Sequence, residues 1–246
     1  GRVRDQNEDA VLVITATHEG DKAVPSLHLF VVADGMGGHR AGEVASSLAA
    51  RVAAHEIVER VCLPSLMNNE RDARNPGLTE VLIDAVQAAN GAVARHVPGG
   101  GTTLICALVL DTQVYVAHVG DSRAYAITPD GIEQMTHDHS LVDRLIQRGS
   151  LTPEEAAEHP QRNVLYRAVG QATILDVDTH VRKFRRGEYL LLCSDGLGNA
   201  VSAADMVTLI RESSSVQDAC EALVGAAYEA GGRDNITVIL WRPSSD

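Results

Sequence analysis

The chain has 246 residues, of which 45% are hydrophobic, and it carries a formal net charge of −12. This length permits a large buried core, and we expect a single domain over residues 1–246. The acidic balance argues against a nucleic-acid or anionic-membrane partner, because both require clustered Lys and Arg to neutralise phosphates.

The sequence has no signal for export or membrane insertion. No apolar stretch approaches the ~18 residues that cross a bilayer, and the first residues contain no apolar signal-peptide core. The cysteines form no C-x-x-C pair and have apolar neighbours; they are Cys62, Cys106, Cys193 and Cys220. This pattern is typical of core thiols in a reducing compartment. We expect a cytoplasmic monomer with no membrane segment and no disulfides.

Short β-rich runs bounded by turn residues predict a series of strands. In chain order these strands cover 10–15, 27–33, 103–110, 113–119, 123–128, 177–184, 188–194 and 235–241. The brief Asp111-Thr112-Gln113 link between two of them indicates an antiparallel hairpin.

Two long stretches, 41–61 and 78–97, have apolar residues at helical spacing. The first predicted stripe contains Val44, Leu48, Val52 and Ile57, and the second contains Val81, Leu82, Ala85, Ala89 and Val93. Shorter helices are predicted at 140–149, 202–211 and 215–230. Consecutive hairpins with helices in blocks favour an α+β layered sandwich, and a doubly wound sheet is the weaker alternative.

The segment 137–170 is polar and interrupts the strands. It contains a helix start, Thr152-Pro153-Glu154-Glu155, with proline at the first helical position. We expect this segment to form a flap-like surface subdomain.

Acidic residues stand at the edges of several predicted strands. They are Glu8, Asp9, Asp34, Asp121, Asp195 and Asp234. A carboxylate at a strand end is held by a rigid scaffold but faces a loop, although a single Asp-Gly there is usually only a turn. Because like charges repel, gathering Asp34, Asp195 and Asp234 without a cation is costly. Carboxylate oxygens are hard ligands, so the pattern predicts a site for Mg²⁺ or Mn²⁺ rather than zinc.

Several other features have two readings. Asp34-Gly35-Met36-Gly37-Gly38-His39 permits carbonyls to approach an ion or is a simple turn. Gly99-Gly100-Gly101-Thr102-Thr103 lacks the Gly-Lys-Ser/Thr of a phosphate loop, so we interpret it as the start of a strand. Arg4 either binds an anion above the carboxylates or is a surface arginine. His118 is expected to be a hydrogen-bonded core residue.

Together these motifs resemble the PPM family, the metal-dependent protein serine/threonine phosphatases of type 2C, and specifically its bacterial branch. The matching segments follow the family's order at 4–9, 32–39, 101–103, 119–123, 159–163, 193–197 and 232–237. They span essentially the whole chain, and their ordered combination is far more specific than any one of them.

The resemblance implies a four-layer α-β-β-α sandwich, with two central antiparallel sheets flanked by helices and a binuclear metal centre at one edge. It implies that Asp34 bridges two Mn²⁺ or Mg²⁺ ions and that Asp195 and Asp234 hold the first. The Gly35 carbonyl and Glu8 are expected to hold the second.

The resemblance also implies roles around the two ions. Asp9 is expected to orient water, and Arg4 to bind the phosphate. Asp121 with Asp195 is expected to hold a third, weaker ion, which Asn163 approaches from the flap. Met36 stands where eukaryotic relatives often have a proton-donating His. The general acid is therefore unassigned, with His39 or a metal-bound water as candidates.

The implied reaction is hydrolysis of phosphoserine and phosphothreonine on proteins by metal-activated water, without a covalent enzyme intermediate. The expected partners are phosphorylated proteins, the products of a serine/threonine kinase. One alternative is a non-catalytic regulatory domain of the same fold, and the retained Asp34, Asp195 and Asp234 count against it. The other, a metal-dependent hydrolase of small phosphoesters, stays open.

Overall fold

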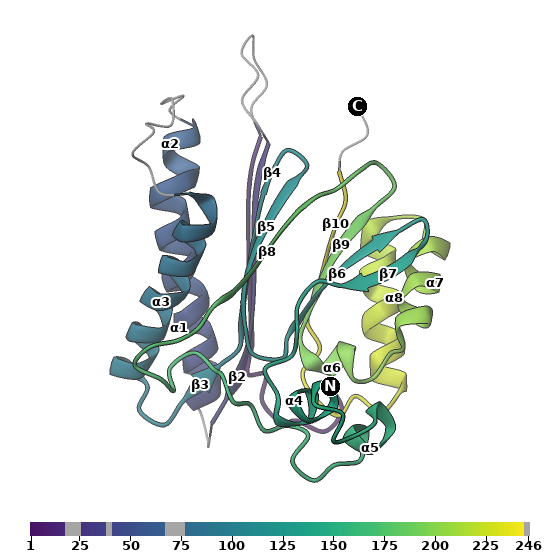
Figure 1. Ribbon diagram of the computed structural model, residues 1–246. Helices are drawn as coiled ribbons and strands as arrows, with labels where there is room; N and C mark the ends of the chain where they lie inside the picture. The colour runs from purple at the N-terminus through teal and green to yellow at the C-terminus, as the bar shows by residue number, and fades with distance from the viewer. Residues whose placement is uncertain (18–25, 38–40, 67–76, 244–246) are drawn as a thin grey trace.

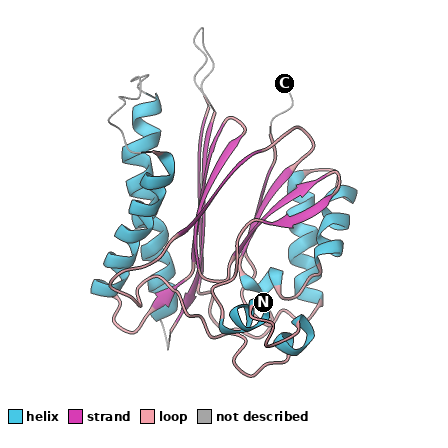
Figure 2. Cartoon of the chain, viewed as in Figure 1, coloured by secondary structure: helices cyan, strands magenta, loops and turns pink. Residues whose placement is uncertain are grey.

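The computed structural model describes residues 1–17, 26–37, 41–66 and 77–243. Two antiparallel sheets face each other at the centre, and helices cover the outer face of each, which gives α-β-β-α layers (Figures 1 and 2). The predicted α+β sandwich is confirmed. The doubly wound alternative is wrong, because every strand pair that the structure describes is antiparallel.

The first sheet has the order β1-β2-β4-β5-β8, with β3 paired to the end of β2. Its strands are β1 (Asp9–Ala16), β2 (Leu27–Met36), β3 (Gly101–Thr102), β4 (Leu104–Leu110), β5 (Gln113–Val119) and β8 (Asp178–Lys183). The predicted hairpin joins β4 to β5, and Asp111 at its turn has a φ of 53°. Aspartate tolerates this left-handed conformation better than most residues.

The second sheet has the order β10-β9-β6-β7. Its strands are β6 (Arg123–Thr128), β7 (Gly131–Gln134), β9 (Tyr189–Cys193) and β10 (Val238–Trp241). β10 begins three residues later than predicted, because the side chains of Asn235 and Thr237 bond to the N-terminal segment and β1 instead. Neither β3 nor β7 was predicted, since both are short.

Helices cover the outer faces. On the first sheet lie α1 (Ala41–Ile57), one π-helical turn η1 (Val58–Cys62), α2 (Leu63–Leu66) and α3 (Leu78–His96). On the second lie α7 (Ala203–Glu212) and α8 (Val216–Glu229). Three short helices, α4 (Leu141–Gln147), α5 (Pro153–Ala157) and α6 (Asp195–Gly198), gather near the N-terminus at the lower end of Figure 1.

The buried face of α1 differs from the predicted stripe. It consists mainly of small residues, namely Gly42, Ala45, Ser46, Ala49, Ala50, Ala53 and Ala54, and it ends with Ile57. Val44 is 48% exposed, so its predicted place in the stripe is wrong. Small side chains let α1 lie close to both the sheet and α3, whereas larger ones are accommodated at the margin. The predicted stripe of α3 is confirmed, because all five residues are buried.

The core consists of three apolar layers. One lies between α1, α3 and the first sheet, one between the two sheets, and one beneath α7 and α8. Cys62, Cys106 and Cys193 are buried, Cys220 is half-buried, and all four thiols are free. None of the described helices combines the length and apolar character needed to cross a bilayer.

The segment 137–170 connects β7 to β8 by way of α4 and α5, and it lies at the lower end of both sheets (Figure 1). The predicted start of α5 is confirmed. The Glu155 amide donates to Thr152 Oγ1, the Thr152 amide donates to the Glu155 carboxylate, and Pro153 is the first helical residue.

Candidate active site

The strand ends of both sheets bring carboxylates to the same edge. In the first sheet, Asp9 at the start of β1 is paired directly opposite Asp34 near the end of β2, so the two side chains lie on one face. In the second sheet, Asp195 follows β9 and Asp234 precedes β10, and these strands pair with each other. Residues far apart in the sequence therefore converge at the lower edge of the sheets in Figure 1.

Hydrogen bonds hold the two edges together. Thr237 Oγ1 donates to Asp9 Oδ2 at 2.6 Å, which links the loop before β10 to β1. Asn235 accepts from the Glu8 amide at 2.9 Å and donates to the Gln6 carbonyl at 3.0 Å. The N-terminal segment is thus fixed against the 234–237 loop.

The backbone of Asp34 is fixed by the stretch that follows the glycine run. Its amide donates to Thr103 Oγ1 at 2.9 Å, and its carbonyl accepts from Thr102 Oγ1 at 2.9 Å. Thr103 Oγ1 also bonds to Ser122 Oγ at 2.7 Å, and Ser122 follows Asp121. The prediction that 99–103 starts a strand is confirmed, but its role in holding Asp34 was missed.

Arg4 points at the cluster. Its Nη2 lies 2.8 Å from Asp234 Oδ2, and Asp234 raises the pKa of the guanidinium through this bond and its charge. The Arg4 side chain is 50% exposed, so donors remain accessible from the solvent side. Arg4 is therefore a surface residue that pairs with a carboxylate of the cluster, and its binding of an anion stays a prediction.

The carboxylates repel one another. Burial raises the pKa of Asp34 well above its usual range, and the charges of Asp9 and Asp195 raise it further. Burial, followed by the charges of Asp234 and Asp9, raises the pKa of Asp195 to about 6. Burial is also the main cause of the raised pKa values of Glu8 and Asp9. A cluster of this kind favours the arrival of positive charge.

The donor set fits hard divalent cations. Buried Glu8 Oε1, Asp9 Oδ1 and Asp195 Oδ1 have no hydrogen-bond partner among the described residues. Among those residues, no group of three or more His, Cys, Asp or Glu side chains is already arranged closely enough to hold a metal ion. Buried oxygens left without donors are those that a cation would satisfy.

Asp121 and Asn163 border the same cleft. A cavity of about 740 Å³ is lined by both, together with Asp195 and Asp234. Burial, and then the charges of Asp195 and Asp138, raise the pKa of Asp121 to about 7. Of the other predicted site residues, Gly35 follows Asp34 in β2, and its amide donates to the Glu8 carbonyl at 3.0 Å. His39 lies outside the described residues.

An ion pair that was not predicted from the sequence joins two residues that line the cleft, Arg123 and Asp138. Arg123 Nη2 donates to Asp138 Oδ2 at 2.6 Å, and Arg123 Nη1 donates to the Gly198 carbonyl at 2.7 Å. The pair joins β6 to the flap and to α6, which begins with Asp195. The sequence offers no signal for this pair, because its partners are 15 residues apart in the chain.

His118 is in the core, but the expectation that it is hydrogen-bonded is wrong. Both ring nitrogens lack a partner in the part of the chain that the structure describes. Burial and neighbouring His139 lower its pKa to about 3, so the ring is neutral. Its ring centroid lies 4.9 Å from that of His139.

The fold and this cleft, in which buried carboxylates lie beside Arg4, can be compared with those of known proteins. The family model for protein phosphatase 2C matches residues 5–227. The serine/threonine phosphatase stp of Listeria innocua is 38% identical, with 98% of this chain and 91% of the relative covered. The protein phosphatase PhpP of Streptococcus pneumoniae is 35% identical, with 98% and 93% covered.

Solved structures lead to the same family. The crystal structure of the Mycobacterium tuberculosis serine/threonine phosphatase PstP/Ppp is 34% identical, with a TM-score of 0.78 and coverage of 97% of this chain and 92% of that one. The PstP catalytic domain in complex with two manganese ions is 32% identical, with a TM-score of 0.76 and the same coverage. The chain belongs to the protein phosphatase 2C family. The predicted resemblance is confirmed.

Proposed function

We propose that this chain hydrolyses phosphoserine and phosphothreonine esters in proteins, with two divalent cations, Mn²⁺ or Mg²⁺, in the acidic cleft. The observation that carries this proposal is the meeting of Asp9 and Asp34 from one sheet with Asp195 and Asp234 from the other. Similarity to named serine/threonine phosphatases over nearly the full length supports it. A relative's structure with two manganese ions supports the cation pair.

The proposed ligand roles are those that the family resemblance implies, and the positions of the carboxylates support them. Asp34, whose pKa responds to both Asp9 and Asp195, is the proposed bridge between the two ions. Asp195 and Asp234 are proposed to hold one ion, and Glu8 with the Gly35 carbonyl to hold the other. A methyl group at Gly42 would come within 2.4 Å of Glu8 Oε1, so glycine at this position leaves room for the carboxylate.

Two further side chains are proposed to act on the substrate and the water. Asp9 Oδ2 accepts from Thr237, which leaves Oδ1, without a partner among the described residues, to accept a hydrogen bond from water and orient it. Arg4, fixed by one bond to Asp234, has further N–H donors for the phosphate oxygens. When bound, the cations supply Lewis acidity, which lowers the pKa of water and offsets charge on the phosphoryl group. Met36 cannot donate a proton, so His39 or water stays the prediction for the general acid.

A third and weaker ion is proposed between Asp121 and Asp195. The charge of Asp195 contributes to the raised pKa of Asp121, and both line the cleft with Asn163. An ion there competes with a proton near neutral pH, which is a reason to expect weaker binding.

The remaining proposals concern the cellular location, the oligomeric state and the alternative functions. We place the protein in the cytoplasm as a monomer that acts on the products of a serine/threonine kinase, and the four free cysteines support a reducing compartment. A non-catalytic role is the less favoured alternative, because every carboxylate of the cleft is retained. Hydrolysis of small phosphoesters is the second candidate, and the open cleft is compatible with it.

Phosphate release from a phosphothreonine peptide tests the proposal. We expect release with Mn²⁺, loss of release after chelation with EDTA, and recovery when Mn²⁺ is added back. A nucleoside monophosphate is the comparison substrate, and we expect it to be cleaved more slowly than the peptide. Absence of hydrolysis with Mn²⁺ and Mg²⁺ would favour the regulatory alternative, and faster cleavage of the nucleotide would favour the small-phosphoester alternative.

A further inference from the structure

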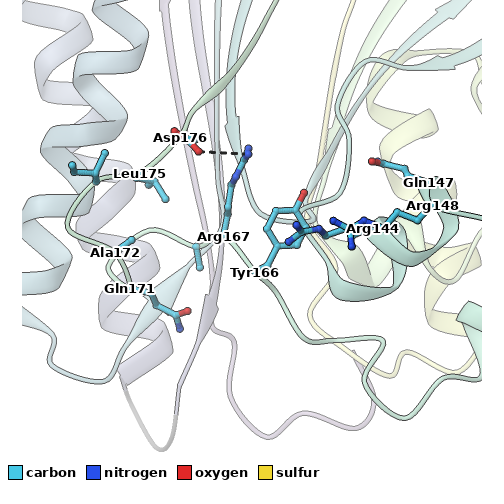
Figure 3. A pocket seen from close by; sticks show the side chains of 11 residues that line it. Arg144, Gln147, Arg148, Tyr166, Arg167, Gln171, Ala172, Leu175 and Asp176 are labelled. Carbon is cyan, nitrogen blue, oxygen red and sulfur yellow. Dashed lines mark ion pairs between the residues drawn. The ribbon is translucent and has the colours of Figure 1, made fainter. Parts of the chain in front are cut away.

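A second pocket lies on the other side of α4 from the acidic cleft. It has a volume of about 670 Å³, and its walls come from α4, from 166–168 and from the 171–176 loop before β8 (Figure 3). Val142, Asp143 and Ile146 of α4 line the acidic cleft, whereas Arg144, Gln147 and Arg148 line this pocket. The one helix therefore separates two sites of opposite charge.

The pocket has surplus positive charge. Three arginines line it, Arg144, Arg148 and Arg167, against one carboxylate, Asp176. Arg167 is paired, because its Nη1 lies 2.9 Å from Asp178 Oδ1 and its Nη2 lies 3.7 Å from Asp176 Oδ2. The side chains of Arg144 and Arg148 form no hydrogen bond or ion pair with any described residue. These two arginines give the pocket a net positive lining in a chain of net charge −12.

An aromatic ring orients the arginines. Tyr166 stands between Arg144 and Arg167 in Figure 3, and the guanidinium carbons lie 5.5 Å and 5.6 Å from the ring centroid. Stacking against an aromatic face restricts a long side chain without using its N–H donors. Those donors stay available to an anion, and planar guanidinium groups match the oxygens of phosphate or carboxylate.

One contact links the pocket to the strand that carries Asp34. Gln171 lines it, and Gln171 Nε2 lies 3.7 Å from Met36 Sδ. Met36 ends β2, two residues after Asp34. We assume that a peptide with its phosphoresidue at the carboxylate cluster runs past Met36 and Gln171 toward the arginines.

We propose that this arginine pocket, defined by Arg144, Arg148, Tyr166 and Arg167, binds a second anionic group of the phosphoprotein substrate. That group is a second phosphoresidue or an acidic side chain close in sequence to the residue being dephosphorylated. The inference rests on the proposed phosphatase function and adds a substrate class to it: segments with more than one negative group.

The test uses peptides of one sequence that contain a phosphothreonine and, at several spacings, a second phosphoserine, an aspartate or an alanine. Each kcat/KM is divided by that for p-nitrophenyl phosphate, which has no second anion. We expect the wild type to prefer an anionic peptide over the alanine peptide by about tenfold, as charge-assisted hydrogen bonds allow. The Arg144→Gln/Arg148→Gln double variant is expected to lose this preference.

The control is a double variant with the same change in net charge at a site outside the pocket. Arg185→Gln/Arg186→Gln alters two exposed arginines in the turn before β9 and is expected to keep the preference. Loss in both double variants would mean that overall charge is the cause and would overturn the inference. If the Arg144→Gln/Arg148→Gln variant loses the preference only for the phosphoserine peptides, the ligand is a second phosphate. If it also loses the preference for the aspartate peptides, the pocket binds any anion.

A binding measurement separates this inference from the proposed function. Fluorescence anisotropy of the same labelled peptides in EDTA reports binding without hydrolysis. A wild type that cleaves phosphothreonine peptides but shows no anionic preference in rate or binding would contradict the arginine pocket alone. A wild type that binds the anionic peptides through Arg144 and Arg148 but cleaves none would contradict the proposed function alone.

Discussion

The sheet edges and the flap at 137–170 hold their residues in different ways. Asp9 and Asp34 belong to paired strands, and Thr102 and Thr103 fix the Asp34 backbone. In the flap, α4 has no fully buried residue, and α5 has only Ala156. Groups that take part in a reaction require fixed geometry, whereas loops that meet varied substrates require less. This difference agrees with the proposal that the sheets carry the reacting groups and that the flap contacts the substrate.

The flap is nevertheless attached firmly at its two ends. The His139 amide donates to the Gly120 carbonyl at 2.8 Å, and the Gly120 amide donates to His139 Nδ1 at 3.1 Å. The His139 carbonyl accepts from the Tyr166 amide at 2.9 Å. One residue therefore joins the beginning and end of the flap to the end of β5, next to Asp121.

Removal of a sheet-edge carboxylate is expected to have the largest effect and is the strongest test of the difference between the sheet edges and the flap. Asp34→Asn and Asp195→Ala are each expected to lower kcat by ~1000-fold or more, because they remove charge where the cations bind. Circular dichroism should report a folded protein in both cases. Asp130→Asn, which changes an exposed aspartate in the turn between β6 and β7, is the matched control and is expected to be fully active. Full activity of either cleft variant would contradict the metal assignment.

The second prediction concerns stability without metal. The folded-state pKa of Asp121 is about 7, above its ordinary value of 3.8, so its contribution to stability is complete below about pH 4 and is lost as the pH rises through 7. In EDTA, raising the pH from about 4 to 8 should lower the unfolding free energy of the wild type relative to Asp121→Asn by a few kcal/mol. Urea unfolding of both proteins measures this, and Mn²⁺ should reduce the difference. Parallel pH profiles in EDTA would contradict it.

A smaller effect is expected for Arg4, the arginine proposed to bind the phosphate. Arg4→Ala should raise KM for a phosphopeptide by about tenfold, or ~1.4 kcal/mol, with a smaller change in kcat, because it removes binding more than water activation. Arg2→Ala is the control, since Arg2 pairs with Glu229 at 2.7 Å instead of the cleft carboxylates. An unchanged KM would remove Arg4 from the site.

The smallest expected effect concerns the flap anchor. Asparagine at position 139 can place an oxygen near Nδ1 and keep the bond from the Gly120 amide, whereas glutamine extends instead toward the Nε2 position and Asp178. His139→Gln should therefore destabilise the protein by ~1 kcal/mol more than His139→Asn. It should also raise KM for a phosphopeptide several-fold. Equal unfolding curves and KM values for the two variants would show that the Gly120 bond does not anchor the flap.

Much of the fold could be predicted from the local pattern of apolar and polar residues. The long strands and α3 have strong periodicity, and their predicted ranges agree with the structure to within a few residues. β3 and β7 were missed because two or four residues carry no periodic signal. Val44 was misplaced because apolar character alone does not reveal that α1 packs through alanines.

The candidate site was readable only as a set of acidic residues. Sequence indicates that Asp34 and Asp195 end strands, but it does not reveal the Thr237 bond to Asp9, the support of Asp34 by Thr103, or the pairing of Arg123 with Asp138. These contacts join segments that are distant in the chain. Arg144 and Arg167 likewise become neighbours of Tyr166 only in the folded protein.

Asn235 connects the two extremities of the chain, because its side chain bonds to both Gln6 and Glu8. During synthesis on a ribosome, Glu8, Asp9 and Asp34 leave the exit tunnel long before Asp195 and Asp234. A nascent polypeptide therefore holds an incomplete set of carboxylates until nearly all of the described chain has emerged. Such long-range closure is slow compared with local folding. Prematurely terminated products that end before Asp195 would lack two of the four sheet-edge carboxylates, Asp195 and Asp234.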